Sequence, residues 1–222
     1  MGMIDGNDNE NRNDPGRTEQ AMSTFLPLGG AAWRRIARFH RDEEASQSVE
    51  ALLIIPLLIW AFLASYTFFD VYRAKGLALK ANYAISDLLS RETNTIDMNY
   101  LLGAESVYDY LTQQDSDPWL RVTVVYCHAN CADSSRVLKA DWSKATDSLP
   151  TFSDVDVMSH LEPIIPWLGE GERVIIVETS TEYTPPFSQN LTGIGGRTFV
   201  DIVMTRPRFA PHLCWDGIGC GA

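Results

Sequence analysis

The sequence predicts an α+β fold in which a long N-terminal helix packs on a small, mainly antiparallel sheet. Three observations predict it. Residues 51–69 form an uncharged apolar run. Downstream of this run, apolar residues recur every three to four positions, which is the period of a helix. Four later segments are rich in β-branched residues or alternate between apolar and polar residues, as strands do.

The apolar run is the first half of the predicted helix. It holds 19 residues without a charge, and about 20 apolar residues cross a bilayer as a helix. A core helix of a soluble protein would show a polar face, and this run shows none. The sequence therefore predicts a single-pass membrane protein, and the mean hydropathy of −0.12 excludes one with many spans.

The second half of the helix is amphipathic. Its apolar positions are Leu77, Lys80 or Ala81, Ala84, Ile85, Leu88 and Leu89. Together the two halves predict one helix from Glu50 to about Glu92, roughly 60 Å long at 1.5 Å per residue. We expect the apolar stripe of the second half to cover one face of the sheet.

The remaining elements follow from local patterns. A second helix is predicted over residues 97–114, with Asp97 as its N-cap. Residues 154–165 indicate a short helix that ends at Pro163, and residues 184–196 are so rich in Pro and Gly that we expect only a loop. Strands are predicted over residues 119–127, 135–143, 173–183 and 197–208.

The chain divides into three parts: a cytoplasmic leader and basic segment (1–45), the membrane helix and its amphipathic continuation (46–92), and an exported α+β domain (93–222). The orientation follows from an excess of basic residues before the apolar run. Those before it are Arg34, Arg35, Arg38 and Arg41, and those close behind it are Arg73 and Lys75. From residue 70 onward, 12 basic and 20 acidic residues give a net charge of −8, which disfavours nucleic acid as a partner.

All four cysteines lie beyond the apolar run, in two local pairs. An even number confined to an exported domain indicates two disulfides. The sequence leaves their connectivity open, and we favour the local pairs Cys127–Cys131 and Cys214–Cys220. A zinc site that uses Cys127, His128, Cys131 and a distal pair is the alternative, although its C-x3-C and C-x5-C spacings fit the usual zinc knuckles poorly.

The sequence holds no motif of a known enzyme class. No G-x-S-x-G, H-E-x-x-H or P-loop pattern occurs, and the four histidines are scattered along the chain. Four tryptophans of the exported part are expected in the core: Trp119, Trp142, Trp167 and Trp215. We therefore expect no catalytic activity, no cofactor and no metal.

A carboxylate, Glu50, stands at the edge of the apolar run, where a charge is costly unless it is paired. Ala45, a small residue, precedes it by five positions, and Pro56 follows inside the run. This stretch resembles the N-terminal segment of type IV pilin-like proteins, most closely the TadE/TadF-like minor pseudopilins of tight-adherence (Tad/Flp) pilus systems. The resemblance extends over most of the chain from about residue 35, through "ADWSKAT", "YTPPF" and "RPRFAP", and residues 45–69 carry its most specific part.

The resemblance implies that a prepilin peptidase cuts between Ala45 and Ser46. Ala45 stands where the family usually has Gly. The new ammonium group of Ser46 would then pair with Glu50, in the same chain or in a neighbour, and so neutralise the charge at the membrane edge. Pro56 removes one backbone donor and is expected to kink the helix.

The function that the resemblance implies is structural. The chain would be a membrane-anchored minor pseudopilin that supports biogenesis of an adhesive Tad pilus in the bacterial inner membrane, with its C-terminal domain periplasmic or extracellular. Its partners would be other pilins and pseudopilins, the pilus assembly machinery, the prepilin peptidase and the lipid bilayer. An uncleaved single-span periplasmic scaffold or binding module of the same secretion apparatus is the alternative, and an anchored hydrolase is the weakest reading.

Overall fold

The structure is a computed structural model that describes residues 43–114 and 117–218, with side chains from residue 48 onward. Its longest element is the helix α2 (Glu43–Arg91), which has 49 residues. The helix therefore begins seven residues before the predicted start at Glu50 and ends one residue before the predicted end. The chain falls into two compact units, residues 1–57 and 58–222, and the sheet belongs to the second.

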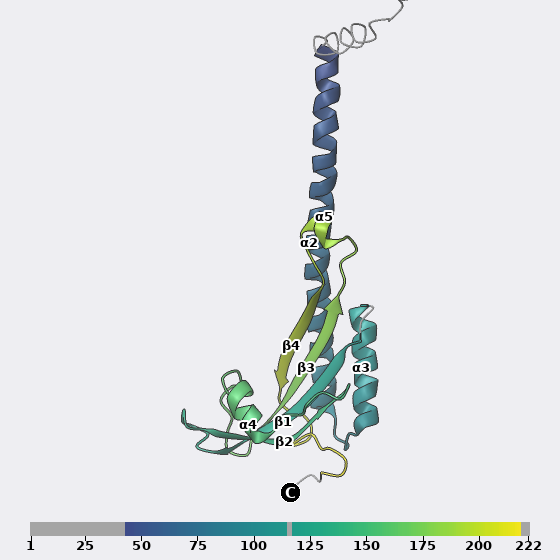
Figure 1. The fold of residues 1–222 in the computed structure, drawn as a ribbon. Coiled ribbons are helices and arrows are strands. Elements are labelled where there is room, and N and C mark those ends of the chain that lie inside the picture. Colours follow the sequence, from purple (N-terminus) through teal and green to yellow (C-terminus); the bar gives the residue numbers. More distant parts are fainter. Residues whose placement is uncertain (1–42, 115–116, 219–222) are drawn as a thin grey trace, which may run out of the picture. The chain divides into compact units, whose positions relative to one another are not determined.

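The sheet has four antiparallel strands in the order β2-β1-β3-β4 (Figure 1). They are β1 (Trp119–Ala129), β2 (Val137–Ala145), β3 (Arg173–Tyr183) and β4 (Arg197–Thr205). The predicted α+β class and all four strands are confirmed. The strand predicted over residues 197–208 ends early at Thr205, because Pro207 has no N–H to donate to the ladder.

One face of the sheet is covered by two helices, the later part of α2 and α3 (Met98–Thr112) (Figure 1). The predicted cap is confirmed, since an Asp97 Oδ1 atom accepts a hydrogen bond from the N–H of Tyr100 at 2.9 Å. The core of this layer includes Ile85, Leu89, Leu101, Tyr108, Val122, Val124, Ile175 and Val177. The expectation that the helix covers the sheet is therefore confirmed.

The stripe by which α2 contacts the sheet differs from the predicted one. Leu88 is 45% exposed and Ala84 is also exposed, although both were expected to face the sheet. The buried positions are mostly small or polar: Ala74, Ala78, Ala81, Asn82, Ile85, Ser86, Leu89 and Ser90. Small side chains let a helix approach a neighbour closely. The face of α2 that carries them therefore packs against the sheet.

The opposite face of the sheet is covered at one end by a short helical segment. It consists of α4 (Asp154–Asp156) and the π-helical turn η1 (Val157–Leu161), so the helix predicted over residues 154–165 ends at Leu161, two residues before Pro163. Ser153 and Asp156 form a capping box at its start. Val157 and Leu161 pack there on Val125, Cys127 and Leu138.

The connection between β3 and β4 is not the plain loop that its Pro and Gly content predicted. It contains one helical turn, α5 (Gln189–Thr192). The Ser188 carbonyl accepts hydrogen bonds from the N–H groups of Leu191 and Thr192. Gly193 ends the turn at a φ of 75°, a left-handed conformation that suits glycine. The Pro and Gly residues thus bound the turn and do not prevent it.

Candidate functional site

The predicted processing residues lie at the start of α2. The helix begins at Glu43, so the peptide bond between Ala45 and Ser46 lies inside its first turn. The side chains of these two residues are outside the described part of the structure. Glu50 lies one turn further on and is exposed. A peptidase would have to unwind this first turn, and helix ends open at low cost.

The apolar half of α2 exposes its large side chains. Leu52, Leu53 and Phe62 are 69–72% exposed, and α2 continues through Pro56 without interruption. Within the described residues, one helix is long and apolar enough to cross a membrane; the most apolar window of that helix has a mean hydropathy of 2.2, and 6% of the window is buried. The kink predicted at Pro56 stays a prediction.

The connection between β3 and β4 contacts α2 inside the apolar run. The indole Nε1–H of Trp60 donates to the carbonyl of Leu191 at 2.8 Å. The Tyr66 and Phe187 rings meet edge to face with centroids 5.9 Å apart. Nothing in the sequence indicated these contacts, because Trp60 and Leu191 are 131 positions apart.

A groove with a volume of about 670 Å³ lies next to this contact, between α2, the end of α3 and the residues after β3. Tyr183 closes one side of it by donating from its hydroxyl to Asp70 Oδ2 at 2.8 Å. Burial raises the pKa of Tyr183, and the hydrogen bond to Asp70 raises it further. Tyr183 therefore stays protonated and keeps donating this bond over the physiological pH range.

Polar side chains lie in the contact between α2 and the sheet. Asn82 Nδ2 donates to the carbonyls of Asp201, at 2.9 Å, and Val177, at 3.3 Å. Buried polar atoms nearby that have no hydrogen-bond partner in the structure include Asn82 Oδ1, Ser86 Oγ and Asp201 Oδ2. Burial raises the pKa of Asp201, and the positive charge of Lys75 opposes this shift. The side chain of Asn82 therefore fixes the helix against two strands.

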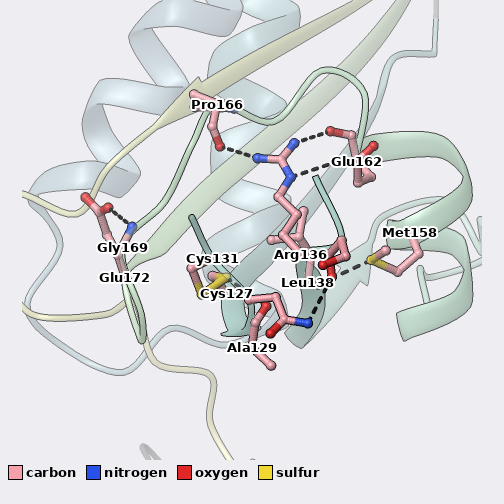
Figure 2. Close-up of a disulfide and its surroundings, with 12 residues drawn as sticks. Cys127, Ala129, Cys131, Arg136, Leu138, Met158, Glu162, Pro166, Gly169 and Glu172 are labelled. Carbon is pink, nitrogen blue, oxygen red and sulfur yellow. Dashed lines mark hydrogen bonds and ion pairs between the residues drawn. A yellow bond between two sulfur atoms is a disulfide. The ribbon is translucent and has the colours of Figure 1, made fainter. Parts of the chain in front are cut away.

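The predicted disulfide Cys127–Cys131 is confirmed, and it closes the turn between β1 and β2 (Figure 2). Since both sulfur atoms are in this bond, they cannot supply the thiolates of the alternative zinc site. Cys214 is also disulfide-bonded. Cys220 lies outside the described residues, so its pairing with Cys214 stays a prediction.

Near the disulfide, a buried arginine holds the chain that follows η1 (Figure 2). Arg136 is 6% exposed, and its guanidinium donates to a Glu162 carboxylate oxygen at 2.8 Å. It also donates to the backbone carbonyls of Glu162, Ile165 and Pro166 at 2.6–2.9 Å. Nothing in the sequence indicates this role, because Arg136 is there only a residue at the start of a predicted strand.

The tryptophans of the sheet domain are divided between core and surface. Trp142 and Trp215 are buried, with ring centroids 5.2 Å apart, as expected. Trp119 is partly exposed. Trp167 is 59% exposed, which corrects the expectation of a core position. It lies with its ring centroid 4.9 Å from the Arg136 guanidinium and lines an open groove of about 630 Å³ beside Cys131.

Comparisons of the chain with protein-family models, with curated proteins and with solved structures find no match. The function must therefore be inferred from the residues themselves. Within residues 48–114 and 117–218, no group of three or more His, Cys, Asp and Glu side chains is placed to hold a metal ion. What the described residues do present is an exposed apolar helix, fixed to a small sheet by buried hydrogen bonds.

Proposed function

We propose that this chain is a membrane-anchored structural protein, a minor pseudopilin that supports assembly of an adhesive pilus of the Tad type. One observation carries the proposal: α2 joins an apolar, largely exposed segment to a segment that packs on a sheet. Apolar surface of this extent needs a cover. The 19 uncharged residues span about 28 Å, close to the roughly 30 Å hydrocarbon thickness of a bilayer.

In this proposal the N-terminus is cytoplasmic and the sheet domain is exported from the bacterial inner membrane. The excess of arginines before the apolar run supports this orientation. The Cys127–Cys131 disulfide supports an oxidising compartment for the sheet domain. The partners would be other pilins and pseudopilins, the assembly machinery and the bilayer, and we propose no catalytic activity.

Glu50 has a specific part in the proposal. After cleavage, the new ammonium group would belong to Ser46, four residues before Glu50. Residues four apart lie on the same face of a helix, so the two charges can pair within one chain as well as between chains. This pairing removes the cost of an uncompensated carboxylate at the edge of the hydrocarbon.

The test is to replace Glu50 with Ala and to measure pili on cells of the native host. We expect the variant to enter the membrane fraction at the wild-type level and to assemble few pili. Glu44→Ala is the matched control, because Glu44 lies before the cleavage point and is removed with the leader. Normal piliation with Glu50→Ala would show that the carboxylate has no role in assembly.

The alternative is that the chain stays uncleaved and serves as a single-span scaffold of the same apparatus. One observation favours it: α2 begins at Glu43, so the bond to be cut is helical and not extended. Intact-mass measurement on protein from the native host separates the two. A mature chain that starts at Ser46 supports the pseudopilin, and a chain that retains residues 1–45 supports the scaffold.

A further inference from the structure

The β3–β4 connection reaches a part of α2 that the proposed function places in the membrane. Trp60, which donates to Leu191, lies nine residues before the end of the apolar run at Phe69. At 1.5 Å per residue, nine residues correspond to about 13 Å along the helix axis. Figure 1 shows α5 against α2 at this level, beyond the end of the sheet.

We propose that residues 184–196, here called the hairpin tip, enter the bilayer beside α2 from the exported side. The inference rests on the proposed membrane anchoring and adds a second lipid contact to it. If residues 51–69 lie in lipid, the hairpin tip cannot remain in water while it is hydrogen-bonded to Trp60.

The bilayer could avoid the hairpin tip only by shifting toward the N-terminus. A shift of nine residues along α2 would bring Glu50 and the charged N-terminus at Ser46 of the cleaved chain into the hydrocarbon; in an uncleaved chain, Glu43 and Glu44 would enter as well. Charged groups at that depth, even as an ion pair, cost more than an uncharged hairpin tip at the interface. The sequence around the apolar run therefore favours entry of the hairpin tip.

The composition of the hairpin tip suits an apolar environment. Its 13 residues include no charged side chain, and charges reappear immediately outside it at Glu182 and Arg197. Leu191, on α5, is 43% exposed, and Phe187 packs on Tyr66 of the helix. An uncharged segment that exposes a leucine can lie at the lipid interface without burying a charge.

Backbone groups of the hairpin tip are hydrogen-bonded, as an apolar environment requires. In such an environment each unpaired N–H or carbonyl is costly. Leu191 donates its N–H to Ser188 at 3.0 Å, and its carbonyl accepts the Trp60 indole at 2.8 Å. Gly193 donates to the Gln189 carbonyl at 2.8 Å. The helical turn thus satisfies the backbone groups at the most apolar part of the hairpin tip.

Aromatic residues on α2 indicate where the membrane surface lies. Trp60, Tyr66 and Tyr72 are 51–63% exposed, and Trp and Tyr gather at the boundary between lipid and water. Trp60 and Tyr66 contact the hairpin tip directly, and Tyr72 lines a pocket together with Ile194 of the tip. We therefore place the hairpin tip at the boundary between head groups and acyl chains, the depth of about 5–10 Å that amphipathic segments reach.

The test uses the full chain, with one added cysteine carrying an environment-sensitive fluorophore, in vesicles of phosphatidylethanolamine and phosphatidylglycerol that contain a doxyl-labelled lipid. Leu191→Cys reports on the hairpin tip, and Asn190→Cys is the second position if the first variant does not fold. Val155→Cys is the matched control, since Val155 is 75% exposed on α4 at the other end of the sheet. Leu53→Cys reports on the membrane helix.

We expect the doxyl lipid to quench Leu191→Cys to within about twofold of Leu53→Cys, as a site 5–10 Å deep requires, and to leave Val155→Cys unquenched. Quenching at residue 53 without quenching at residue 191 would overturn the inference and leave the anchoring intact. No quenching at residue 53 would overturn the anchoring, and the inference with it. Protection of residue 191 from both the doxyl lipid and aqueous iodide would show that protein covers it, which also overturns the inference.

Discussion

Replacing Arg136 with Met should destabilise the sheet domain more than the loss of any surface charge. The guanidinium is almost fully buried and bonds to the Glu162 carboxylate and to three backbone carbonyls. Met fills part of the volume but donates no hydrogen bond. The carbonyls of Glu162, Ile165 and Pro166 then lose their hydrogen-bond donor at a site that water reaches only in part.

The expected loss of unfolding free energy depends on how deeply the acceptors of the Arg136 guanidinium are buried. Breaking a buried ion pair by removing one partner costs about 3–5 kcal/mol. The Glu162 side chain is 29% exposed, so water can replace part of what it loses, and we expect a cost near the lower end, about 3 kcal/mol. For a domain of this size, that cost corresponds to a fall in Tm of about 10 °C.

The measurement is thermal unfolding of the full chain in detergent, followed by tryptophan fluorescence. Limited proteolysis after residue 161 gives a local readout, because the network holds the chain there. Arg136→Lys should fall between the wild type and Arg136→Met, since an ammonium keeps the charge but lacks the planar fork that reaches several acceptors.

Arg91→Met is the matched control. Arg91 pairs with Asp87 on the exposed surface of α2, where the two side chains are 54% and 42% exposed, and such pairs contribute about 0–1 kcal/mol. Equal Tm values for Arg136→Met and Arg91→Met would refute the reasoning, because burial of the network would then have no energetic consequence.

Three further outcomes are expected from the same unfolding assay. Asn82→Ala should cost about 1–3 kcal/mol, because two buried carbonyls lose their donor; a value within error of the wild type would remove Asn82 from the helix–sheet contact. Replacing Cys127 and Cys131 with Ser should cost about 2 kcal/mol, as expected for closing a short loop, and reduction of the wild type should cost at least as much, because it also opens the disulfide of Cys214. Burial raises the folded pKa of Asp201 above 3.8, so its ionisation costs more in the folded state than in the unfolded state. Wild-type stability should therefore fall as the pH rises from about 4 through the raised pKa, and Asp201→Asn should lose this part of the pH dependence.

The elements of the fold could be predicted where the signal is local. β3 was predicted to the residue, because Arg173–Tyr183 is rich in β-branched residues and is flanked by turn residues. The Cys127–Cys131 bond could be predicted because its partners are four positions apart. These patterns depend on neighbours in the sequence, and no tertiary contact is needed to read them.

The rotation of α2 could not be predicted from hydropathy. A hydrophobic pattern favours Leu88 on the buried face and Asn82 on the exposed face, and the structure has the reverse. The sheet presents carbonyls at Val177 and Asp201 that accept from the Asn82 amide, and a leucine has no group that could donate to them. The identity of the buried face therefore depends on acceptors that lie 95 and 119 positions away.

The contacts of the candidate site were beyond sequence reasoning for the same reason. Trp60 stands in an apolar segment and is expected to face lipid. No feature of the sequence shows that its indole N–H donates to the carbonyl of Leu191. Arg136 donates to Glu162, 26 positions away, across a segment whose π-helical turn has no sequence signature of its own. The sequence around Arg136 is typical of an exposed strand. The burial of its guanidinium can be recognised only from the three-dimensional positions of the carbonyls that accept its hydrogen bonds.

The two distant contacts of α2 have a joint mechanical consequence. Trp60 and Asn82 bind the sheet domain at positions 22 residues apart, which is about 33 Å along the helix. A domain bonded to a helix at two levels that far apart cannot pivot about either contact alone. A force that draws the helix out of the membrane, as the proposed pilus assembly would require, must therefore carry the sheet domain with it, and it must also carry the hairpin tip unless the tip first releases Trp60.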